Sequence, residues 1–476
     1  MVRINLYIYK PKNYTMTALL ILVFILGYLA ITLEHPLKLD KTVPALLMAA
    51  ILWALLAMGF HYGWFNVVDG HENVFSFLEG HDTEHNEEGF TNLLLHHLGK
   101  TAEILVFLIG AMTIVEIIDL HRGFDVLKSW VKTNSKKKLL WILCGLGFIL
   151  SAIIDNLTAT IVLVTLLRKL IPERNDRLWY AGMIVIAANA GGAWSPIGDV
   201  TTTMLWIAKK VSALHLVERL ILPSIVCMAV PTFIASLLPV FRGNVEMDMN
   251  EYNEEDKTLL SSKTMLYLGL GMIISVPIFK TITHLPPYIG MMLALGVVWL
   301  VSEYIHPEED FTEERKHLYS AHQALSRIEM SSILFFLGIL MAVAALESLV
   351  YGSVMIDGQE VQVGTLRYMA EMLNNSIPNL SVVVALLGVL SAVIDNVPLV
   401  AASMGMYNFP MDHSVWHLIA YAAGTGGSML IIGSAAGVAA MGMEKIDFIW
   451  YLKKITWLAA LGFIVGFFLL LFMESL

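Results

Sequence analysis

Apolar runs of about 18 or more residues recur along this chain, and a run of that length crosses a bilayer as one helix. Hydrophobic residues make up 57% of the 476 residues. Charged residues make up only 15%, against about 25% in an ordinary soluble protein. A soluble chain of this length would need a polar surface that this composition does not supply. The sequence therefore predicts an all-α polytopic membrane protein surrounded by membrane lipid, with no nucleic-acid partner.

The apolar stretches fall into full spans and two exceptions. Full spans are expected at 16–33, 43–60, 102–119, 180–208, 219–240, 264–283, 287–305, 330–349, 414–444 and 455–473. Regions 139–170 and 377–411 differ, because each has an Asp-Asn pair in the middle of an apolar run. The arms of 139–170 hold roughly 14 to 16 residues, or about 21–24 Å of helix, which is short of the roughly 30 Å hydrocarbon core. We therefore predict two re-entrant helical hairpins that turn at mid-depth on Asp-Asn.

The two hairpins belong to an internal repeat. SAIIDNLTATIV at 151–162 matches SAVIDNVPLVAA at 391–402. Downstream, NAGGAWSPIGDVTTTMLW at 189–206 matches GTGGSMLIIGSAAGVAAM at 424–441, so each half carries a hairpin and then a transmembrane helix broken at a glycine pair. Glycine pairs also serve plain helix packing. Two matched sets beside matched Asp-Asn tips instead favour broken helices that line a transport site.

Positive charge predicts how the halves are oriented. Basic residues flank the first hairpin on both sides, at Lys136, Lys137, Lys138, Arg168, Lys169, Arg174 and Arg177, whereas 377–413 contains no Lys or Arg. Because cytoplasmic loops are rich in Lys and Arg, the first hairpin is expected to enter from the cytoplasm. The second hairpin, five spans later, is expected to enter from the opposite side, which makes the repeat inverted.

This repeat divides the chain into four expected parts. Scaffold helices and an outer loop rich in His and acids occupy 1–138, and the first hairpin and broken helix occupy 139–218. An acidic linker and further scaffold helices occupy 219–376. The second hairpin, its broken helix and the last helix occupy 377–476.

Carboxylates inside a membrane need a partner, because a charge at the bilayer centre costs at least about 2.5–3.5 kcal/mol. No Lys or Arg lies close in sequence to Asp155 or Asp395, so a bound cation or a proton is the remaining partner. Amide and hydroxyl oxygens accompany both aspartates. The predicted ion-coupling set is Asp155, Asn156, Thr158, Asn189, Asp199, Thr201, Thr202, Ser391, Asp395, Asn396 and Ser428.

The chemistry of this set favours a small hard cation. Oxygen ligands that include carboxylates suit Na+ or Li+, and Na+ is expected at Asp155, Asn156, Asp199, Asp395 and Asn396. Asp199 has Ser434 as its repeat mate, so the site is net negative. Burial raises the pKa of a carboxyl and a nearby cation lowers it, so one site can hold Na+ and H+ in turn. We therefore expect an antiporter, with no cofactor and no enzyme chemistry.

Other polar residues lie outside this set. Glu103, Glu116 and Glu347 lie within apolar spans and are candidates for a proton relay, with a position at a helix end near water as the alternative for Glu103. The stretch 61–97 contains six His among acidic residues. It reads either as a solvated outer loop or as a site that binds divalent metal or senses pH.

The three quoted segments, with SAVIDNVPLVAASM at the second tip, resemble the NhaD-type sodium/proton antiporters of the ion transporter superfamily. The pattern covers about residues 90 to 445. This resemblance implies export of Na+ or Li+ in exchange for protons at alkaline pH, in a bacterial inner membrane, although plant plastid relatives also exist. It also implies a scaffold that forms a homodimer, a moving transport domain that holds both hairpins, and ion coupling at the Asp-Asn pairs and the GDVTT segment.

Two other functions are alternatives to the antiporter. A symporter that carries an organic or inorganic anion with Na+ or H+ is the alternative, but dicarboxylate-transporting relatives have Ser-Asn-Thr at their tips, where this chain has Asp-Asn-Leu-Thr and Asp-Asn-Val-Pro. An intramembrane aspartyl protease would pair two aspartates around one proton. Its Gly-x-Gly-Asp signature is absent here, because Asp199 follows Ser-Pro-Ile-Gly.

Overall fold

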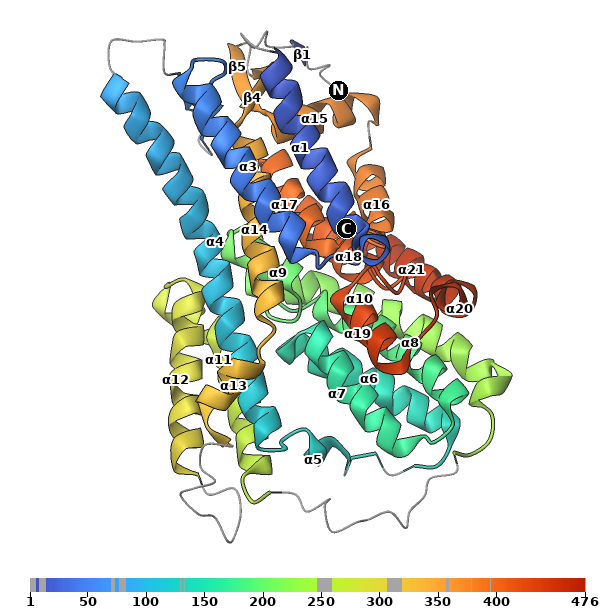
Figure 1. Cartoon of the computed structure of the whole chain (residues 1–476). Coiled ribbons are helices and arrows are strands. Elements are labelled where there is room, and N and C mark those ends of the chain that lie inside the picture. Colours follow the sequence, from blue (N-terminus) through green and yellow to red (C-terminus); the bar gives the residue numbers. More distant parts are fainter. Residues whose placement is uncertain are drawn as a thin grey trace. The chain divides into compact units, whose positions relative to one another are not determined.

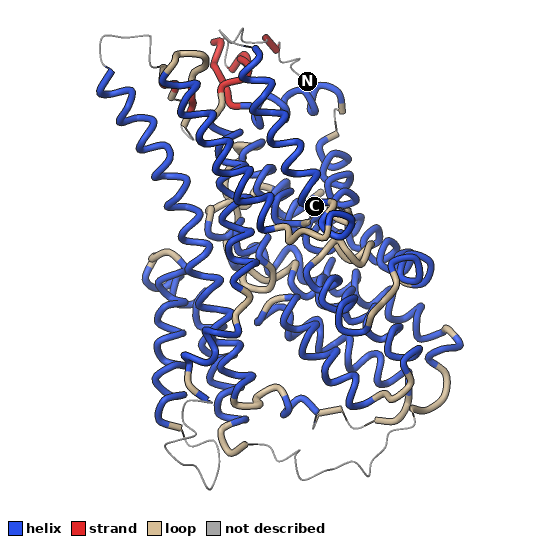
Figure 2. The backbone as a smooth tube through the Cα atoms, in the orientation of Figure 1, coloured by secondary structure: helices blue, strands red, loops and turns tan. Residues whose placement is uncertain are grey.

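The structure is a computed structural model that describes residues 6–7, 14–69, 73–76, 83–128, 130–131, 133–245, 259–305, 319–356, 359–377, 379–393 and 395–475. Figures 1 and 2 show helices joined by loops, with two small sheets. The helices are α1 (Tyr14–Thr32), α2 (Glu34–Leu37), α3 (Thr42–His61), α4 (Thr83–Leu120), α5 (Asp125–Lys128), α6 (Lys136–Ile154), α7 (Asn156–Leu170), α8 (Arg174–Gly192), α9 (Val200–Ile207), α10 (Ala213–Leu237), α11 (Ser262–Thr283), α12 (Pro287–Tyr304), α13 (Ala321–Arg327), α14 (Met330–Ser348), α15 (Thr365–Ser376), α16 (Leu380–Leu390), α17 (Asn396–Met406), α18 (Ser414–Gly426), α19 (Ala435–Glu444), α20 (Phe448–Lys454) and α21 (Thr456–Glu474), with a short 3-10 helix at Pro239–Phe241. The strands are β1 (Leu6–Tyr7), β2 (Val67–Val68), β3 (Val74–Phe75), β4 (Val350–Ile356) and β5 (Gln359–Gly364).

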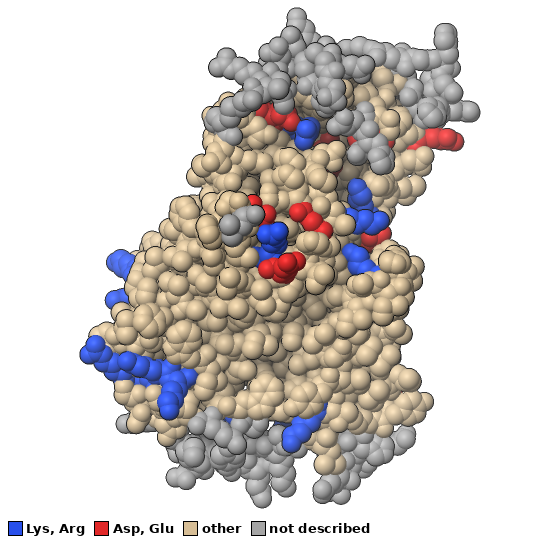
Figure 3. Space-filling view, turned by 180° about the vertical axis from the view of Figure 1, so that it is seen from behind, with Lys and Arg blue, Asp and Glu red and all other residues tan. Residues whose placement is uncertain are grey.

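Within the described residues, nine helices are long and apolar enough to cross a membrane, or ten if the bent pair α15–α16 is one span. The nine are α1, α3, α4, α6, α10, α11, α12, α14 and α21. Figure 3 shows a face that is mostly uncharged, with its Lys, Arg, Asp and Glu side chains in separate patches. The prediction of a helical, multi-pass membrane protein is confirmed.

The first hairpin arm differs from its prediction. Helix α6 has 19 residues and is long enough to span, because it begins at Lys136, three residues before the apolar run. Its partner α7 has 15 residues. The prediction that both arms are too short to cross the hydrocarbon core is therefore wrong for α6. Similarly, the predicted span at 102–119 is the end of a helix of 38 residues, α4, whose first half carries polar residues.

The chain divides into two compact units, which are described separately. Unit 1 comprises 1–105, 329–384 and 397–410, and unit 2 comprises 106–328, 385–396 and 411–476. In unit 1, α14 packs closely on α3, because Gly338 has no side chain: a Cβ there would lie 2.7 Å from the backbone carbon of Ala45. The indole Nε1 of Trp53 donates to the carbonyl of Met341 at 2.8 Å.

Unit 1 also contains a sheet that was not predicted. Strands β4 and β5 pair antiparallel, and β1 pairs with the other edge of β4. A sequence signal for this hairpin is present: Asp357-Gly358 separates two runs that contain β-branched and aromatic residues, VYGSVMI and QEVQVG, and Asp-Gly between such runs predicts a two-residue turn between strands.

Unit 2 is built around α8, which is buried continuously from Tyr180 to Gly192. Helices α6, α7, α10, α18 and α19 pack against it. Because other helices cover α8, its polar side chains can contact those of its neighbours without contacting lipid. This arrangement gives the interior of unit 2 its polar site.

Candidate functional site

The tip of the first hairpin is Asp155, the one residue between α6 and α7. Its backbone has φ 82° and ψ 161°, a region that is almost restricted to glycine. Its carboxylate caps α7, accepting from the backbone N–H of Thr158 at 2.7 Å and from the Thr158 hydroxyl at 3.0 Å. The aspartate is thus held in a strained conformation that keeps a carboxylate at the helix break.

This strain predicts an unusual order of stability at position 155. Asp155→Gly is expected to be more stable than Asp155→Ala by about 1–3 kcal/mol, because only glycine adopts this conformation without steric cost. Both variants lack the carboxylate, so the comparison isolates the backbone. Thermal unfolding of the two purified proteins measures the difference. Equal melting temperatures would contradict the strain.

The first broken helix consists of α8 and α9, separated by 193–199. Asp199 caps α9 by accepting from the backbone N–H of Thr201 at 3.2 Å. The Thr202 hydroxyl donates to the carbonyls of Ser195 at 2.7 Å and Asp199 at 2.9 Å, and it therefore holds the unwound segment in shape. The Thr201 hydroxyl is buried and has no hydrogen-bond partner among the described residues.

Four buried side chains of unit 2 form what we call the polar cluster: Asn156, Asn189, Asp199 and Ser434. The Nδ2 of Asn156 donates to Oδ1 of Asn189 at 3.0 Å and to Oδ2 of Asp199 at 3.2 Å. The Nδ2 of Asn189 donates to the Ser434 hydroxyl at 2.9 Å. The cluster thus joins the first hairpin, both parts of the first broken helix and the second broken helix.

The second tip has its own buried pair. The Ser391 hydroxyl donates to Oδ1 of Asn396 and to the carbonyl of Ala423 at 3.0 Å. In the first half, the hydroxyl of Ser151 donates to the carbonyl of Ala188 at 2.6 Å. Ser151 and Ser391 are repeat mates, and the two carbonyls stand at equivalent places, so the halves make the same contact.

Negative charge accumulates around the polar cluster. Asp155 and Asp395 lie close enough to Asp199 for their charges to act on it. Among the described residues, no group of three or more His, Cys, Asp or Glu could hold a metal ion. The arrangement offers one buried carboxylate, two nearby ones and neutral oxygens.

The remaining predicted residues lie outside the polar cluster. The Ser428 hydroxyl, just beyond the end of α18, donates to the carbonyl of Thr425 at 2.7 Å. Glu116 interacts with Asp119 and Arg327 near the end of α4. Glu103 and Glu347 belong to unit 1, and a Cβ on Gly405 would lie 3.3 Å from Oε2 of Glu347. Much of the His-rich loop, including His71 and His81, lies outside the described residues.

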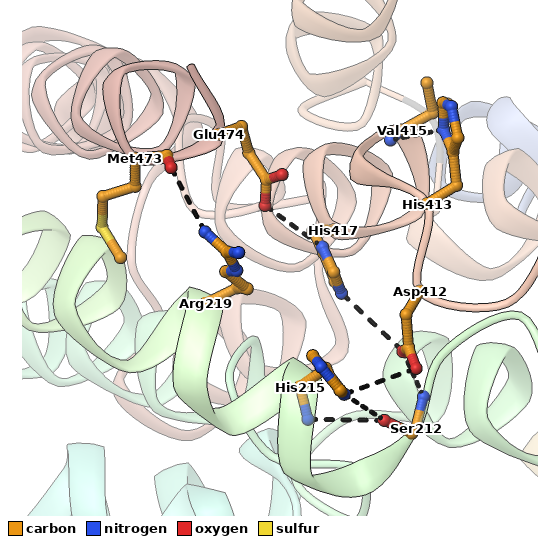
Figure 4. Close-up of polar contacts among 9 residues, drawn as sticks. All are labelled: Ser212, His215, Arg219, Asp412, His413, Val415, His417, Met473 and Glu474. Carbon is orange, nitrogen blue, oxygen red and sulfur yellow. Dashed lines mark hydrogen bonds and ion pairs between the residues drawn. The ribbon is translucent and has the colours of Figure 1, made fainter. Parts of the chain in front are cut away.

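Sequence reasoning missed a second polar network in unit 2, drawn in Figure 4. Asp412 accepts from the backbone N–H of Ser212 at 2.6 Å, and its own N–H donates to the carbonyl of Lys210 at 2.9 Å. The buried His417 lies 3.2 Å from Glu474 through Nδ1. Ser212 lies 200 residues from Asp412, and Glu474 lies 57 residues from His417, so no local motif predicts the network.

Comparison with known proteins matches the features above. A family profile described as "Citrate transporter" matches residues 6–417. "Sodium/proton antiporter 1" of Arabidopsis thaliana is 44% identical over 448 residues, which cover 94% of this chain and 70% of the relative. "Sodium/proton antiporter 2" of the same plant is 41% identical and covered over 97% of its length. "Na(+)/H(+) antiporter NhaD" of Alkalimonas amylolytica is 33% identical over 89% of this chain and 84% of the relative.

The relatives and the family profile place the chain in a class of transporters, not of enzymes. The chain belongs to the NhaD-type sodium/proton antiporters, within the broader family that the citrate transporter profile describes. The family predicted from the Asp-Asn and Gly-Asp-Val-Thr-Thr segments is therefore confirmed.

Proposed function

We propose that this chain exchanges Na+ for H+ across the membrane by alternating access, and that the exchange takes place at the polar cluster of unit 2. The observation that carries the proposal is Asp199, a buried carboxylate that lies close enough to Asp155 and Asp395 for their negative charges to act on it. A buried carboxylate among like charges needs a cation or a proton to offset the cost of its charge. Competition between Na+ and H+ for this carboxylate is the core of an antiport mechanism.

The residues around Asp199 supply the other ligands in this proposal. Asn156 and Asn189 have amide oxygens in the cluster, and the partnerless Thr201 hydroxyl lies two residues from Asp199. Small hard cations prefer such oxygens. Asp155, Asp395 and Asn396 complete the proposed Na+ set, with Thr158, Thr202, Ser391 and Ser428 as supports that hold the tips and breaks in shape.

The repeated contacts support an inverted repeat that works by alternating access. A Cβ on Gly191 would lie 2.2 Å from the carbonyl oxygen of Phe148, and a Cβ on Gly426 would lie 2.2 Å from that of Gly388. Each broken helix thus touches its own hairpin arm through a glycine at the same repeat position. We propose that the segments 139–218 and 377–476 form the moving transport domain, and that the remaining helices form the scaffold.

Several finer statements belong to the same proposal. We propose that Li+ is carried as well as Na+, that the physiological role is sodium and alkaline-pH homeostasis, and that two copies form a dimer through the scaffold. The proposed location is the bacterial inner membrane. The Arabidopsis thaliana relatives make a membrane of a plant cell the alternative, which fluorescence microscopy of a tagged chain in its own cells distinguishes.

An anion symporter is the second candidate, and the name of the family profile is what favours it. The negative charge around Asp199 weighs against it, because an anion would need cationic groups or free helix N-termini at the site. The N-termini of α7 and α9 are already capped by Asp155 and Asp199.

Proton flux in everted membrane vesicles tests the function. The host lacks its own sodium antiporters, and an acid-inside gradient is imposed before NaCl, LiCl, KCl or a sodium-free dicarboxylate is added between pH 7 and 9.5. We expect the gradient to collapse with Na+ and Li+ only. The absence of a response to Na+ at any pH would contradict the proposed antiport. Sodium-coupled citrate uptake would then establish the symporter.

A further inference from the structure

A buried carboxylate lies at the far ends of the helices that form the polar cluster. Glu444 ends α19, and its side chain is only 2% exposed. Arg168 on α7 donates through Nε to its Oε1 at 2.7 Å, and Arg177 on α8 donates through Nε to its Oε2 at 3.1 Å. Arg174 donates to the carbonyls of Glu444 and Lys445 at 3.3 and 3.1 Å. We call these four residues the Glu444 clamp.

The clamp and the polar cluster join the same three helices at opposite ends. Helix α7 carries Asn156 at its start and Arg168 near its end, and α8 carries Arg177 near its start and Asn189 near its end. Helix α19 begins after Ser434 and ends at Glu444. At 1.5 Å per residue, the two ends are roughly 15–18 Å apart on each helix. The three helices are therefore held together by polar contacts at both ends, at the polar cluster and at the Glu444 clamp.

The clamp uses strong interactions. Charge-assisted hydrogen bonds are shorter and about twice as strong as neutral ones. The side chain of Glu444 is 2% exposed and that of Arg177 is 18% exposed, so removal of the Glu444 charge leaves Arg177 uncompensated in a largely buried place, whereas Arg168 is 46% exposed and keeps contact with solvent. Arg174 adds donors to the carbonyls at the end of α19, where the helix dipole is negative. Glu444 is the centre of this arrangement, because each of the three arginines contacts either its carboxylate or its carbonyl.

The internal repeat provides an independent comparison. Arg177 and Asp412 stand the same number of residues before Gly191 and Gly426. Asp412 also fastens the beginning of one broken helix to the end of the other, through Ser212 and Lys210. In each half, a polar contact at the same repeat position therefore joins the beginning of one broken helix to the end of the other, although the residue types differ. This repetition indicates that the contact stabilises the arrangement of the helices.

We propose that Glu444 is a positioning residue for the ion site: it holds α7, α8 and α19 in register, so that Asn156, Asn189 and Ser434 meet around Asp199. It does not contact the ion. This inference rests on the proposed function for the identity of the ion, but not for the coupling between the clamp and the cluster, which can be measured without transport.

Hydrogen–deuterium exchange measures the coupling, with Glu444→Gln as the test. The amide keeps the size of the side chain and removes its charge. We expect backbone exchange in 193–199 to accelerate at least fivefold, at the lower end of the usual range for coupling between distant sites. Glu444→Asp keeps the charge with a shorter reach and is expected to be intermediate. Glu173→Gln removes an exposed carboxylate next to Arg174 and is expected to leave exchange unchanged.

Transport kinetics give the second readout. In Glu444→Gln, the apparent KM for Na+ is expected to rise at least fivefold, and Glu444→Asp is expected to restore most of the affinity. Faster exchange confined to residues 440–447, with 193–199 unchanged, would overturn the positioning role even if the variant folds poorly. If the wild type moves no protons on addition of Na+ but the exchange coupling is present, the proposed function fails and the positioning role stands.

Discussion

Asp199→Asn is expected to abolish Na+-dependent proton movement while the protein remains folded. The amide keeps the shape of the side chain and one oxygen that accepts from Thr201, so the cap of α9 survives. It removes the buried charge that draws Na+ or H+ into the cluster. The exchange rate is expected to fall by at least about 100-fold, the scale on which loss of a proton-carrying group slows proton transfer. Fluorescence quenching in everted vesicles measures the rate.

Asp447→Asn is the matched control for this variant. Asp447 also caps a helix, accepting from the backbone N–H of Trp450 at 2.9 Å, but it caps α20 outside the polar cluster. Its substitution is expected to leave transport unchanged. Transport by Asp199→Asn at more than half of the wild-type rate, with equal protein in the membrane, would remove Asp199 from the mechanism.

Gly191→Ala is expected to destabilise unit 2 severely. A Cβ at this position would lie 2.2 Å from the carbonyl oxygen of Phe148 and 2.7 Å from its Cα, which is backbone that cannot rotate away. Helices α6 and α8 would have to separate, at a cost of about 1–3 kcal/mol or more. The same separation would pull Asn189 away from Asn156. Thermal unfolding in detergent and the yield of monodisperse protein measure the effect.

Gly145→Ala is the control for the glycine effect. Gly145 lies in α6, and a Cβ there meets nothing within 4 Å. This substitution is expected to stabilise the helix slightly, by up to about 1 kcal/mol, because alanine restricts the unfolded chain and favours helix. If Gly191→Ala melted at the same temperature as Gly145→Ala, the close contact of α8 with α6 would be refuted.

The spans and the two breaks were predictable because each has a strong local cause. Lipid requires long apolar helices, and Asp-Asn pairs or glycine pairs within such helices mark places where the helix cannot continue normally. The breaks at Asp155 and after Gly192 lie where the sequence indicates them. The length of α6 was misjudged because Lys136, Lys137 and Lys138 are helical, although they are too polar to count toward an apolar run.

The contacts between the halves were not predictable from local pattern. The bond from Asn189 to Ser434 joins residues 245 positions apart, and the Glu444 clamp joins residues separated by 267 to 276 positions. The sequence identified Ser434 only as the repeat mate of Asp199, and Arg168 and Arg177 only as markers of the cytoplasmic side. The β4–β5 hairpin has a local signal in its Asp-Gly pair, but 350–364 follows directly on an apolar span and is too short and too polar to read as a span itself.

The most direct test of the account is uptake of radioactive sodium, driven by a pH gradient, into proteoliposomes that contain only the purified chain. An acid-inside pH gradient is imposed, and accumulation of 22Na+ is followed for the wild type and for Asp199→Asn. We predict that the wild type accumulates 22Na+ only while the gradient lasts, and that Asp199→Asn does not. Failure of the wild type to accumulate 22Na+, or equal accumulation by the two proteins, would contradict exchange of Na+ for H+ at the polar cluster.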